Sequence, residues 1–595
     1  MLRRGSLALF FLVPVALAQD AITPHAGPAL EEVRVIGSRD TAYLEGWGDG
    51  QSISRNEQLS LGRSVADWIG ALPGVSLNGQ GGLLQAYSIR GFSRARVRTE
   101  VDGVPILTDR RAGNSASFVP SALLQSVRVD NSAASSLYGS GALGGVVHMQ
   151  TLQGEGTTVE GRLRSNDELG ELTLANTREQ RTLALSLRRA GDGEAPDGEP
   201  LHSRFEQAAL LLRGRSQWRD GTVEYSWLPS VGRDIGRSNS AYPDTRISTT
   251  PEELHSLERV ELRTGDHLLR LYHHYQDWDS DVLRVDERRN LTRYRGHTVG
   301  GLYLADLALL PGRGSWGLEW LGRRGVEITD REIGADGVSL PAQRVVDGDE
   351  DTIGLFVDQE WSVGAVALKG ALRMDRVAQS AAESHDDFQP SGSLGLTYYP
   401  ATGWTAGVEA ARAFRFPSLS ERYFNGTTPR GGVLGNPDLE PEVRRNLDFS
   451  LRYESDGGFA VAWNGYVSDL DNYIERVDVT DSLLTYRNVA AARLWGMELD
   501  MRWRTGALTH QLSYQWQQGE ADGGETLADL NPPAWRYYAS WDLASLTLRS
   551  DLMYRPARSR YGSDELPLDE ALVWGLALAG SENAGGLSWE VQLNN

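Results

Sequence analysis

The sequence predicts an all-β transmembrane barrel of about 22 antiparallel strands, preceded by a small domain of mixed α and β structure. From about residue 155 onward, apolar and polar residues alternate over segments of roughly ten residues, and this pattern recurs many times. The connections between these segments are alternately long and short. After the first twenty residues, no stretch is apolar over a length that would cross a bilayer as a helix.

Composition excludes several classes of function. The 595 residues carry a net charge of −21, so no overall basic character is available to neutralise nucleic-acid phosphates. Cysteine is absent, which excludes a disulfide scaffold and a cysteine-built metal site. There is no zinc-spaced His/Glu set, nucleophile elbow or phosphate loop, so we expect no enzymatic activity, no cofactor and no resident metal ion.

Residues 1–18 have the features of a secretory signal peptide. Arg3 and Arg4 precede a short apolar run over residues 7–17, which ends in an Ala-Leu-Ala sequence. The run is too short to cross a bilayer as a helix. A membrane anchor is the alternative, but the pattern predicts a cleaved signal and a mature protein outside the cytoplasm.

Residues 45–151 lack the barrel pattern and predict a separate α+β domain. Residues 64–75 have the pattern of a short N-capped helix that is stopped by Pro and Gly. Two strand-like stretches at 85–92 and 101–106 end in turns, and a Gly-rich turn enters a further strand at 136–147. Because a wide barrel leaves a lumen that can be filled, we expect this domain to be a plug inside it.

The barrel itself is predicted over residues 155–595. Leu447, Phe449 and Leu451, for example, alternate with polar neighbours, which places the apolar side chains on one face of a strand. We count about twenty-one such strands, with long connections after the odd-numbered ones. A soluble β-solenoid or propeller is the alternative, but no repeat of fixed period is present. The longest connections are 190–205, 230–253, 326–351 and 413–443.

The C-terminal end predicts an incomplete ladder. The last strand falls at 585–593, and no closing strand follows, although single-chain outer-membrane barrels have an even number of strands. We therefore expect the last strand to be missing. The first strand, 157–165, would then lack its regular partner or pair out of register with 585–593, at a high cost in unpaired backbone groups.

Motifs along the chain resemble those of TonB-dependent outer-membrane receptors. In the 45–151 domain they are Leu-Pro-Gly-Val, Ile-Arg-Gly, Val-Asp-Gly-Val-Pro-Ile and Leu-Tyr-Gly-Ser-Gly-Ala-Leu-Gly-Gly-Val-Val, in the order of that family. In the barrel they are Ala-Phe-Arg-Phe-Pro-Ser-Leu at 413–419, Gly-Asn-Pro-Asp-Leu-Glu-Pro-Glu at 435–442, and an Arg-Asn-Val and Gly-Met-Glu pair within 487–499.

The resemblance implies a monomeric transporter in the bacterial outer membrane, in contact with lipopolysaccharide. Such receptors bind a metal chelate from outside, and TonB, energised from the inner membrane, remodels the plug. We expect active uptake of an iron–siderophore complex. Haem, cobalamin or another metal chelate is the alternative ligand. A passive porin or a surface adhesin is the alternative from a different class, but a diffusion porin has no reason to fill its lumen with a domain.

Residues 31–37 resemble the TonB box of that family. An exposed strand-like segment suits pairing with another chain, because backbone hydrogen bonds supply the affinity. The alternative is that this stretch is the first strand of the plug. The residues expected to contact TonB are Glu32, Val33, Arg34, Val35, Ile36 and Gly37.

The resemblance also implies that buried Arg–Glu contacts couple plug to barrel. Arg90, Glu442 and Glu498 occupy the matching motif positions. A second plug arginine of the family pattern is replaced here by Asn131, so a four-charge cluster is in question. Other plug arginines could substitute for it, namely Arg94, Arg96 or Arg98.

Candidate ligand residues lie in the predicted extracellular connections. Arg233, Arg237 and Arg246 could attract an anionic iron chelate or, equally, lipopolysaccharide phosphates. Tyr423 is a further candidate, because no histidine lies between Ser418 and Gly435, where haem receptors of the family typically carry one. The adjacent residues His273 and His274 are expected to point to opposite faces of a strand and therefore not to chelate one ion.

Overall fold

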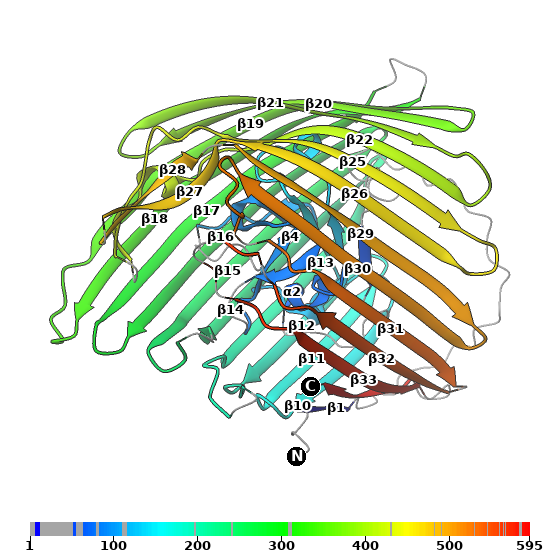
Figure 1. The fold of residues 1–595 in the computed structure, drawn as a ribbon, viewed down its shortest axis with the longest axis horizontal. Coiled ribbons are helices and arrows are strands. Elements are labelled where there is room, and N and C mark those ends of the chain that lie inside the picture. Colours follow the sequence, from blue (N-terminus) through cyan, green and yellow to red (C-terminus); the bar gives the residue numbers. More distant parts are fainter. Residues whose placement is uncertain are drawn as a thin grey trace.

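The computed structural model shows a wide, closed β-barrel with a small domain inside it (Figure 1). The N-terminal part of the small domain, blue in Figure 1, is surrounded by the barrel strands. The structure describes residues 6–11, 51–54, 64–78, 82–109, 116–195, 198–237, 239, 242–307, 312–428, 431–480, 482–489, 491–528, 530–543, 545–558, 560–562, 565, 567–581 and 586–594.

Among the residues that the structure describes, twenty-one barrel strands lie within 156–594, and each runs antiparallel to its neighbours. Alternate side chains point to opposite faces: Leu269 and Leu271 on β16 are exposed outside, whereas Arg270 and Tyr272 are buried against the plug side. The strands are β10 (Gly156–Arg164), β11 (Leu169–Arg178), β12 (Arg181–Ala190), β13 (Phe205–Trp218), β14 (Gly221–Arg237), β15 (Arg246–Thr264), β16 (His267–Arg284), β17 (Arg288–Asp306), β18 (Arg313–Gly334), β19 (Gln343–Val363), β20 (Val366–Ser380), β21 (Ser384–Tyr398), β22 (Trp404–Arg415), β25 (Glu442–Glu454), β26 (Ala460–Asp471), β29 (Ala492–Thr505), β30 (Leu508–Ala521), β31 (Ala534–Leu543), β32 (Leu546–Arg555), β33 (Ala571–Ser581) and β34 (Ser588–Asn594).

The ladder closes through a strand from the N-terminus, β1 (Ser6–Phe11), which lies between β10 and β34. Leu9 is paired with Leu163 on one side and with Val591 on the other. The expectation that β10 would lack a regular partner, or pair out of register with β34, is therefore wrong. The backbone of β1 pairs with both edges. Because β1 lies within residues 1–18, it belongs to the ladder only in a chain that retains the predicted signal peptide. The signal peptide over residues 1–18 stays a prediction.

Several strands extend far beyond the apolar belt on one side of the barrel. The expected loop 230–253 is largely the ends of β14 and β15, and the expected loop 326–351 is largely β18 and β19. Polar residues are frequent on both faces of these extensions, although Ile235, Val326 and Ile328 are buried there, so the alternation between apolar and polar residues is weak. The opposite ends are joined by short connections such as 219–220, 265–266 and 506–507, as predicted.

Within its described residues, the plug contains two sheets and two short helices. A five-stranded sheet has the order β2-β8-β9-β6-β7, and a three-stranded sheet the order β3-β4-β5. Their apolar faces form one core with the inner wall of the barrel, in which Trp68 is fully buried. The elements are β2 (Gln51–Ser54), α2 (Val65–Ile69), β3 (Val75–Asn78), β4 (Ala86–Ile89), β5 (Phe92–Ser93), the 3-10 turns η2 (Arg94–Arg96) and η3 (Ser121–Leu123), β6 (Val97–Val101), β7 (Val104–Pro105), β8 (Leu124–Asp130), α3 (Ser135–Tyr138) and β9 (Gly145–Thr151).

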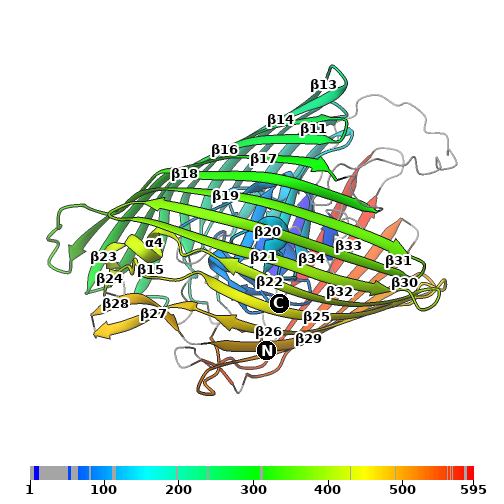
Figure 2. The ribbon, with the colours of Figure 1, turned by 90° about the horizontal axis from the view of Figure 1, so that it is seen from above.

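Two long connections between barrel strands join into one small sheet at the end with the longer connections (Figure 2). The order is β23-β24-β28-β27, in which β23 (Asn425–Thr428) and β24 (Gly431–Leu434) come from one connection, and β27 (Tyr473–Thr480) and β28 (Leu483–Val489) from the other. The helix α4 (Leu419–Tyr423) precedes β23. Within the described residues, no helix is long and apolar enough to cross a membrane.

Candidate functional site

Arg90 fastens the plug to the barrel wall through two carboxylates. Its Nε and Nη2 donate to the two oxygens of Glu498 on β29 at 2.8 and 2.9 Å, and its Nη1 donates to Asp448 on β25 at 2.8 Å. The guanidinium also lies 4.2 Å from the centre of the Tyr466 ring. Burial alone would lower the pKa of Arg90, but the attraction of Glu498 and Asp448 outweighs burial and raises it. Arg90 is therefore a permanently charged, fully engaged anchor.

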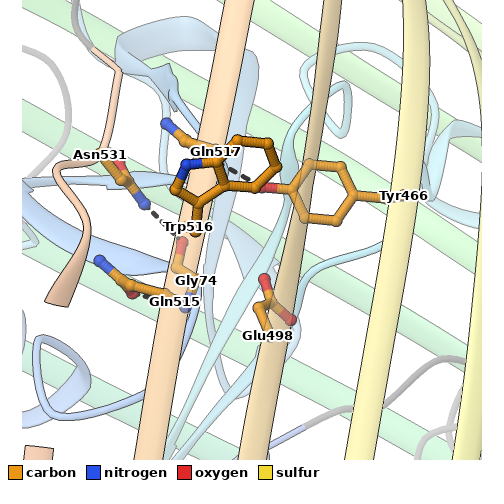
Figure 3. A pocket seen from close by; sticks show the side chains of 7 residues that line it. All are labelled: Gly74, Tyr466, Glu498, Gln515, Trp516, Gln517 and Asn531. Carbon is orange, nitrogen blue, oxygen red and sulfur yellow. Dashed lines mark hydrogen bonds between the residues drawn. The ribbon is translucent and has the colours of Figure 1, made fainter. Parts of the chain in front are cut away.

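The backbone of the plug approaches the wall beside this anchor, at Gly74 (Figure 3). The Gly74 N–H donates to Gln515 Oε1, and its carbonyl accepts from Asn531 Nδ2, both at 2.8 Å. The residue has φ +79°, and a Cβ there would lie 2.1 Å from Glu498 Oε1. Only glycine fits this conformation and this space. The Leu-Pro-Gly-Val motif thus marks a seam between plug and barrel.

A second anchor is formed by Arg96. Its Nη2 donates to Glu442 Oε1 at 2.7 Å and to the carbonyl of Ile474 at 2.8 Å. Glu442 also accepts from Arg415 Nε of the barrel at 2.6 Å, so one buried carboxylate is shared by a plug arginine and a barrel arginine. The guanidinium of Arg96 lies 3.8 Å from the centre of the Tyr473 ring. Burial would lower the pKa of Arg96, but Glu442 raises it.

A third anchor is formed by Arg98 on β6. Its Nη2 donates to Glu319 of β18 at 2.9 Å, and its Nε donates to Glu100 of the plug at 2.8 Å. Glu319 also accepts from Arg373 of β20 at 2.9 Å, and Arg373 donates to Asp375. All five side chains are buried. Three separate arginines therefore hold the plug at three places on the wall.

The structure brings together two of the three residues predicted to couple plug and barrel. Arg90 meets Glu498, whereas Glu442 meets Arg96. Arg98 forms a further contact between plug and barrel. Arg96 and Arg98 are two of the three arginines that the sequence offers in place of the family arginine at position 131. The coupling role of these contacts stays a prediction.

Asn131 lies beside the first anchor rather than forming one of its own. Its carbonyl accepts from Arg90 Nη1 at 3.3 Å, and its Nδ2 donates to the Pro73 carbonyl at 3.4 Å. Asn131 therefore connects Arg90 with the Leu-Pro-Gly-Val segment through hydrogen bonds and adds no charge. Arg94, the remaining candidate, is exposed. The segment 31–37 lies outside the described residues.

The apical end of the plug is tied to the barrel wall and to an extracellular connection. Asp109 forms a short ion pair with Arg323 of β18, and it accepts a hydrogen bond from Ser420 of α4 at 3.0 Å. The carbonyl of Leu107 accepts from Gln276 of β16 at 2.6 Å. The plug apex, the wall and α4 therefore meet at one point.

Histidines lie on both sides of the same wall. His274 points inward and is fully buried, whereas His273 points outward, as predicted from their adjacency. His274 meets His255 at 3.0 Å, and Phe118 of the plug stacks on His255 with ring centres 4.3 Å apart. Sequence analysis missed His255, because this pair depends on the register between two strands. Among the described residues, no group of three His, Cys, Asp or Glu side chains is arranged to hold a metal ion.

The predicted ligand arginines lie on the extended parts of β14 and β15. The guanidinium of Arg246 lies 3.7 Å from the centre of the Tyr242 ring, and Arg237 donates to Ser248 Oγ at 3.2 Å. The side chain of Arg233 is 66% exposed. They stay predictions for a ligand or lipopolysaccharide contact. Tyr423 lies elsewhere, half-buried at the end of α4.

A closed transmembrane barrel whose lumen is filled by a domain held through buried ion pairs defines a plugged outer-membrane receptor. The comparison with known families agrees. The family model "TonB-dependent Receptor Plug Domain" matches residues 51–146, and "TonB dependent receptor-like, beta-barrel" matches residues 160–595. The chain belongs to the TonB-dependent receptors, which are transporters of the bacterial outer membrane and not enzymes.

Solved structures share the fold. The copper transporter OprC has a TM-score of 0.77 at 17% identity, covering 92% of this chain and 98% of that one. The Serratia marcescens haemophore receptor HasR, solved with its haemophore and haem, has a TM-score of 0.71 at 16% identity, and the match covers 93% of this chain and 99% of that one. The ferric yersiniabactin uptake receptor FyuA from Yersinia pestis has a TM-score of 0.69 at 14% identity, and the match covers 92% of this chain and 98% of that one. At these identities the likeness concerns the fold, and the ligands of these proteins differ.

Proposed function

We propose that this receptor imports an iron–siderophore complex across the outer membrane with energy delivered by TonB. The observation that carries the proposal is the set of three buried arginine anchors. Breaking a buried ion pair by removing one partner costs about 3–5 kcal/mol, so a plug held at three such places does not leave its seat by thermal fluctuation alone. Passage of a solute then requires work on the plug, which a passive porin does not perform.

The ligand assignment is supported by composition and by the structural neighbours. Siderophore receptors are among those neighbours, including one from Acinetobacter baumannii named PirA. Copper favours soft sulfur ligands, and this chain has no Cys and only 6 Met. The connection that carries α4 contains no histidine between Ser418 and Gly435, which disfavours haem. A ferric chelate brings its own metal ligands and needs none from the protein.

TonB is proposed to pair with residues 32–37. The five-stranded plug sheet begins with β2 at Gln51, so this segment precedes the first described strand of the plug. Strand addition needs only backbone groups and tolerates many side chains, in keeping with the alternating sequence Glu-Val-Arg-Val-Ile-Gly.

The proposal is tested by growth of iron-starved cells that lack this gene and regain it. Ferric siderophores of several chemical classes, haem and cobalamin are supplied singly, and uptake of radioactive iron is measured with and without TonB. We expect one siderophore class to restore growth only when both the gene and TonB are present. Rescue by haem or cobalamin alone, or uptake that persists without TonB, would contradict it.

A further inference from the structure

Each of the first four residues of the short helix α4 contacts the barrel wall or the plug. Leu419 is fully buried in an apolar cluster with side chains of β16 to β19. Ser420 donates to the plug residue Asp109. Glu421 accepts two hydrogen bonds from Arg415, at 2.7 and 3.0 Å, and also caps the helix. Arg422 is buried and donates to Gln379, Asp387 and the carbonyl of Leu439.

Two routes connect α4 to the plug. The direct route runs from Ser420 to Asp109, whose other oxygen pairs with Arg323. The second route runs from Glu421 through Arg415 and Glu442 to Arg96, the second plug anchor. A displacement of α4 therefore changes the surroundings of two plug residues at once.

The surface beneath α4 has a definite chemistry. Trp278 and Tyr294 stack with ring centres 5.2 Å apart and planes 12° from parallel, and both belong to the cluster that Leu419 completes. Arg323 donates to the Tyr294 hydroxyl and to Asp109, and its side chain is only 5% exposed. An aromatic platform beside a guanidinium is complementary to a flat aromatic group that carries negative charge.

We propose that α4 occupies the seat of the ligand, and that an anionic chelate with aromatic metal-binding groups takes its place. The aromatic groups would replace Leu419 over Trp278 and Tyr294, and the anion would replace Asp109 on Arg323. Asp109 would then lose its contacts with Ser420 and Arg323, which would alter the plug at its apical end. This inference rests on the proposed function and adds the ligand class and the way in which binding reaches the plug.

A reversible cross-link tests the displacement of α4. The chain contains no cysteine, so the pair Asp109→Cys with Ser420→Cys would be the only thiols. The purified receptor is titrated with the ferric complex of 2,3-dihydroxybenzoate, oxidised and then reduced. We expect binding to weaken at least tenfold when oxidised and to return on reduction. Equal binding in both states would overturn the proposal. Ser420→Ala alone should strengthen binding several-fold, whereas a purely structural role of this hydroxyl would weaken it.

Three probes test the ligand class: the same aromatic ferric complex, ferric citrate, which is anionic without aromatic groups, and ferrioxamine B, which is neither. Arg323→Gln should weaken binding of both anions, and Trp278→Ala should weaken only the aromatic one. Arg344→Gln, which removes an exposed ion pair with Asp347, is the matched control and should change nothing. Preference for ferrioxamine B, or binding of none of the three, would overturn the class.

The growth experiment separates this inference from the proposed function. Rescue by a non-aromatic siderophore would leave the proposed function standing and overturn the inference. Absence of rescue by every siderophore would overturn the proposed function itself. Rescue by an aromatic siderophore, lost on Trp278→Ala and kept on Arg344→Gln, is the result that supports both.

Discussion

Removing Arg90 should loosen the plug without opening the barrel. The substitution Arg90→Ala deletes three charge-assisted hydrogen bonds and strands Glu498, which is 2% exposed, together with Asp448. Leaving a buried charge without its partner costs about 3–5 kcal/mol. With a urea dependence of about 1.5 kcal/mol per M for a domain of this size, the midpoint for plug unfolding should fall by about 2–3 M.

Hydrogen exchange measured as a function of urea resolves this effect. Amides of β8 and β9 report on the plug, and amides of β16 and β17 report on the barrel, whose closed ladder should remain protected. The control is Arg376→Ala on the outer face, where Arg376 and Asp386 are 64% and 60% exposed. Such a pair contributes about 0–1 kcal/mol.

A shift below about 0.5 M for Arg90→Ala, or one equal to that of the control, would refute the reasoning. The double variant Arg90→Ala with Glu498→Ala isolates the pair. If the contact is the source of the effect, the double variant should be less destabilised than the sum of the two single variants.

Four further outcomes are expected. Val33→Pro or Val35→Pro should abolish iron uptake while ligand binding at the cell surface persists, because proline removes a backbone donor from the predicted TonB-pairing segment; unchanged uptake would place that segment elsewhere. Gly74→Val should reduce protease resistance of the plug, since a Cβ would meet Glu498 at 2.1 Å; a fully protected plug would contradict the geometry. Glu442→Gln should weaken plug protection near Arg96, measured by hydrogen exchange, with no change near Arg90. Deletion of residues 51–151 should give a stable pore of high conductance in planar bilayers, and a closed channel would contradict the role of the plug.

The barrel strands were predictable because their signal is local. Each of the twenty-one segments predicted by alternation overlaps one of the barrel strands between β10 and β34. The alternation is weak in the extended ends of β14 and β15, where polar residues such as Ser230, Ser248 and Thr250 take buried positions, so the sequence predicts loops there.

The partners within the site were less predictable because they depend on how two domains meet. Arg90 and Glu498 are 408 positions apart, and Arg96 and Glu442 are 346 apart. Motif resemblance named three of these four residues but could not pair them. The meeting of Asp109 with α4 had no sequence signal at all, because it depends on the fold of an extracellular connection.

The glycines of the plug motifs have a consequence for how such receptors diverge. Gly74 and Gly103 lie where the plug touches the wall, and a Cβ on Gly103 would come within 2.2 Å of Arg270. The plug motifs therefore include residues that pack directly against the barrel wall. Asp109, Trp278 and Arg323 belong to none of these motifs. If the proposed seat under α4 sets the cargo preference, that preference can change while the contacts at Gly74 and Gly103 stay the same. The same recognisable sequence signature can serve chemically unrelated nutrients.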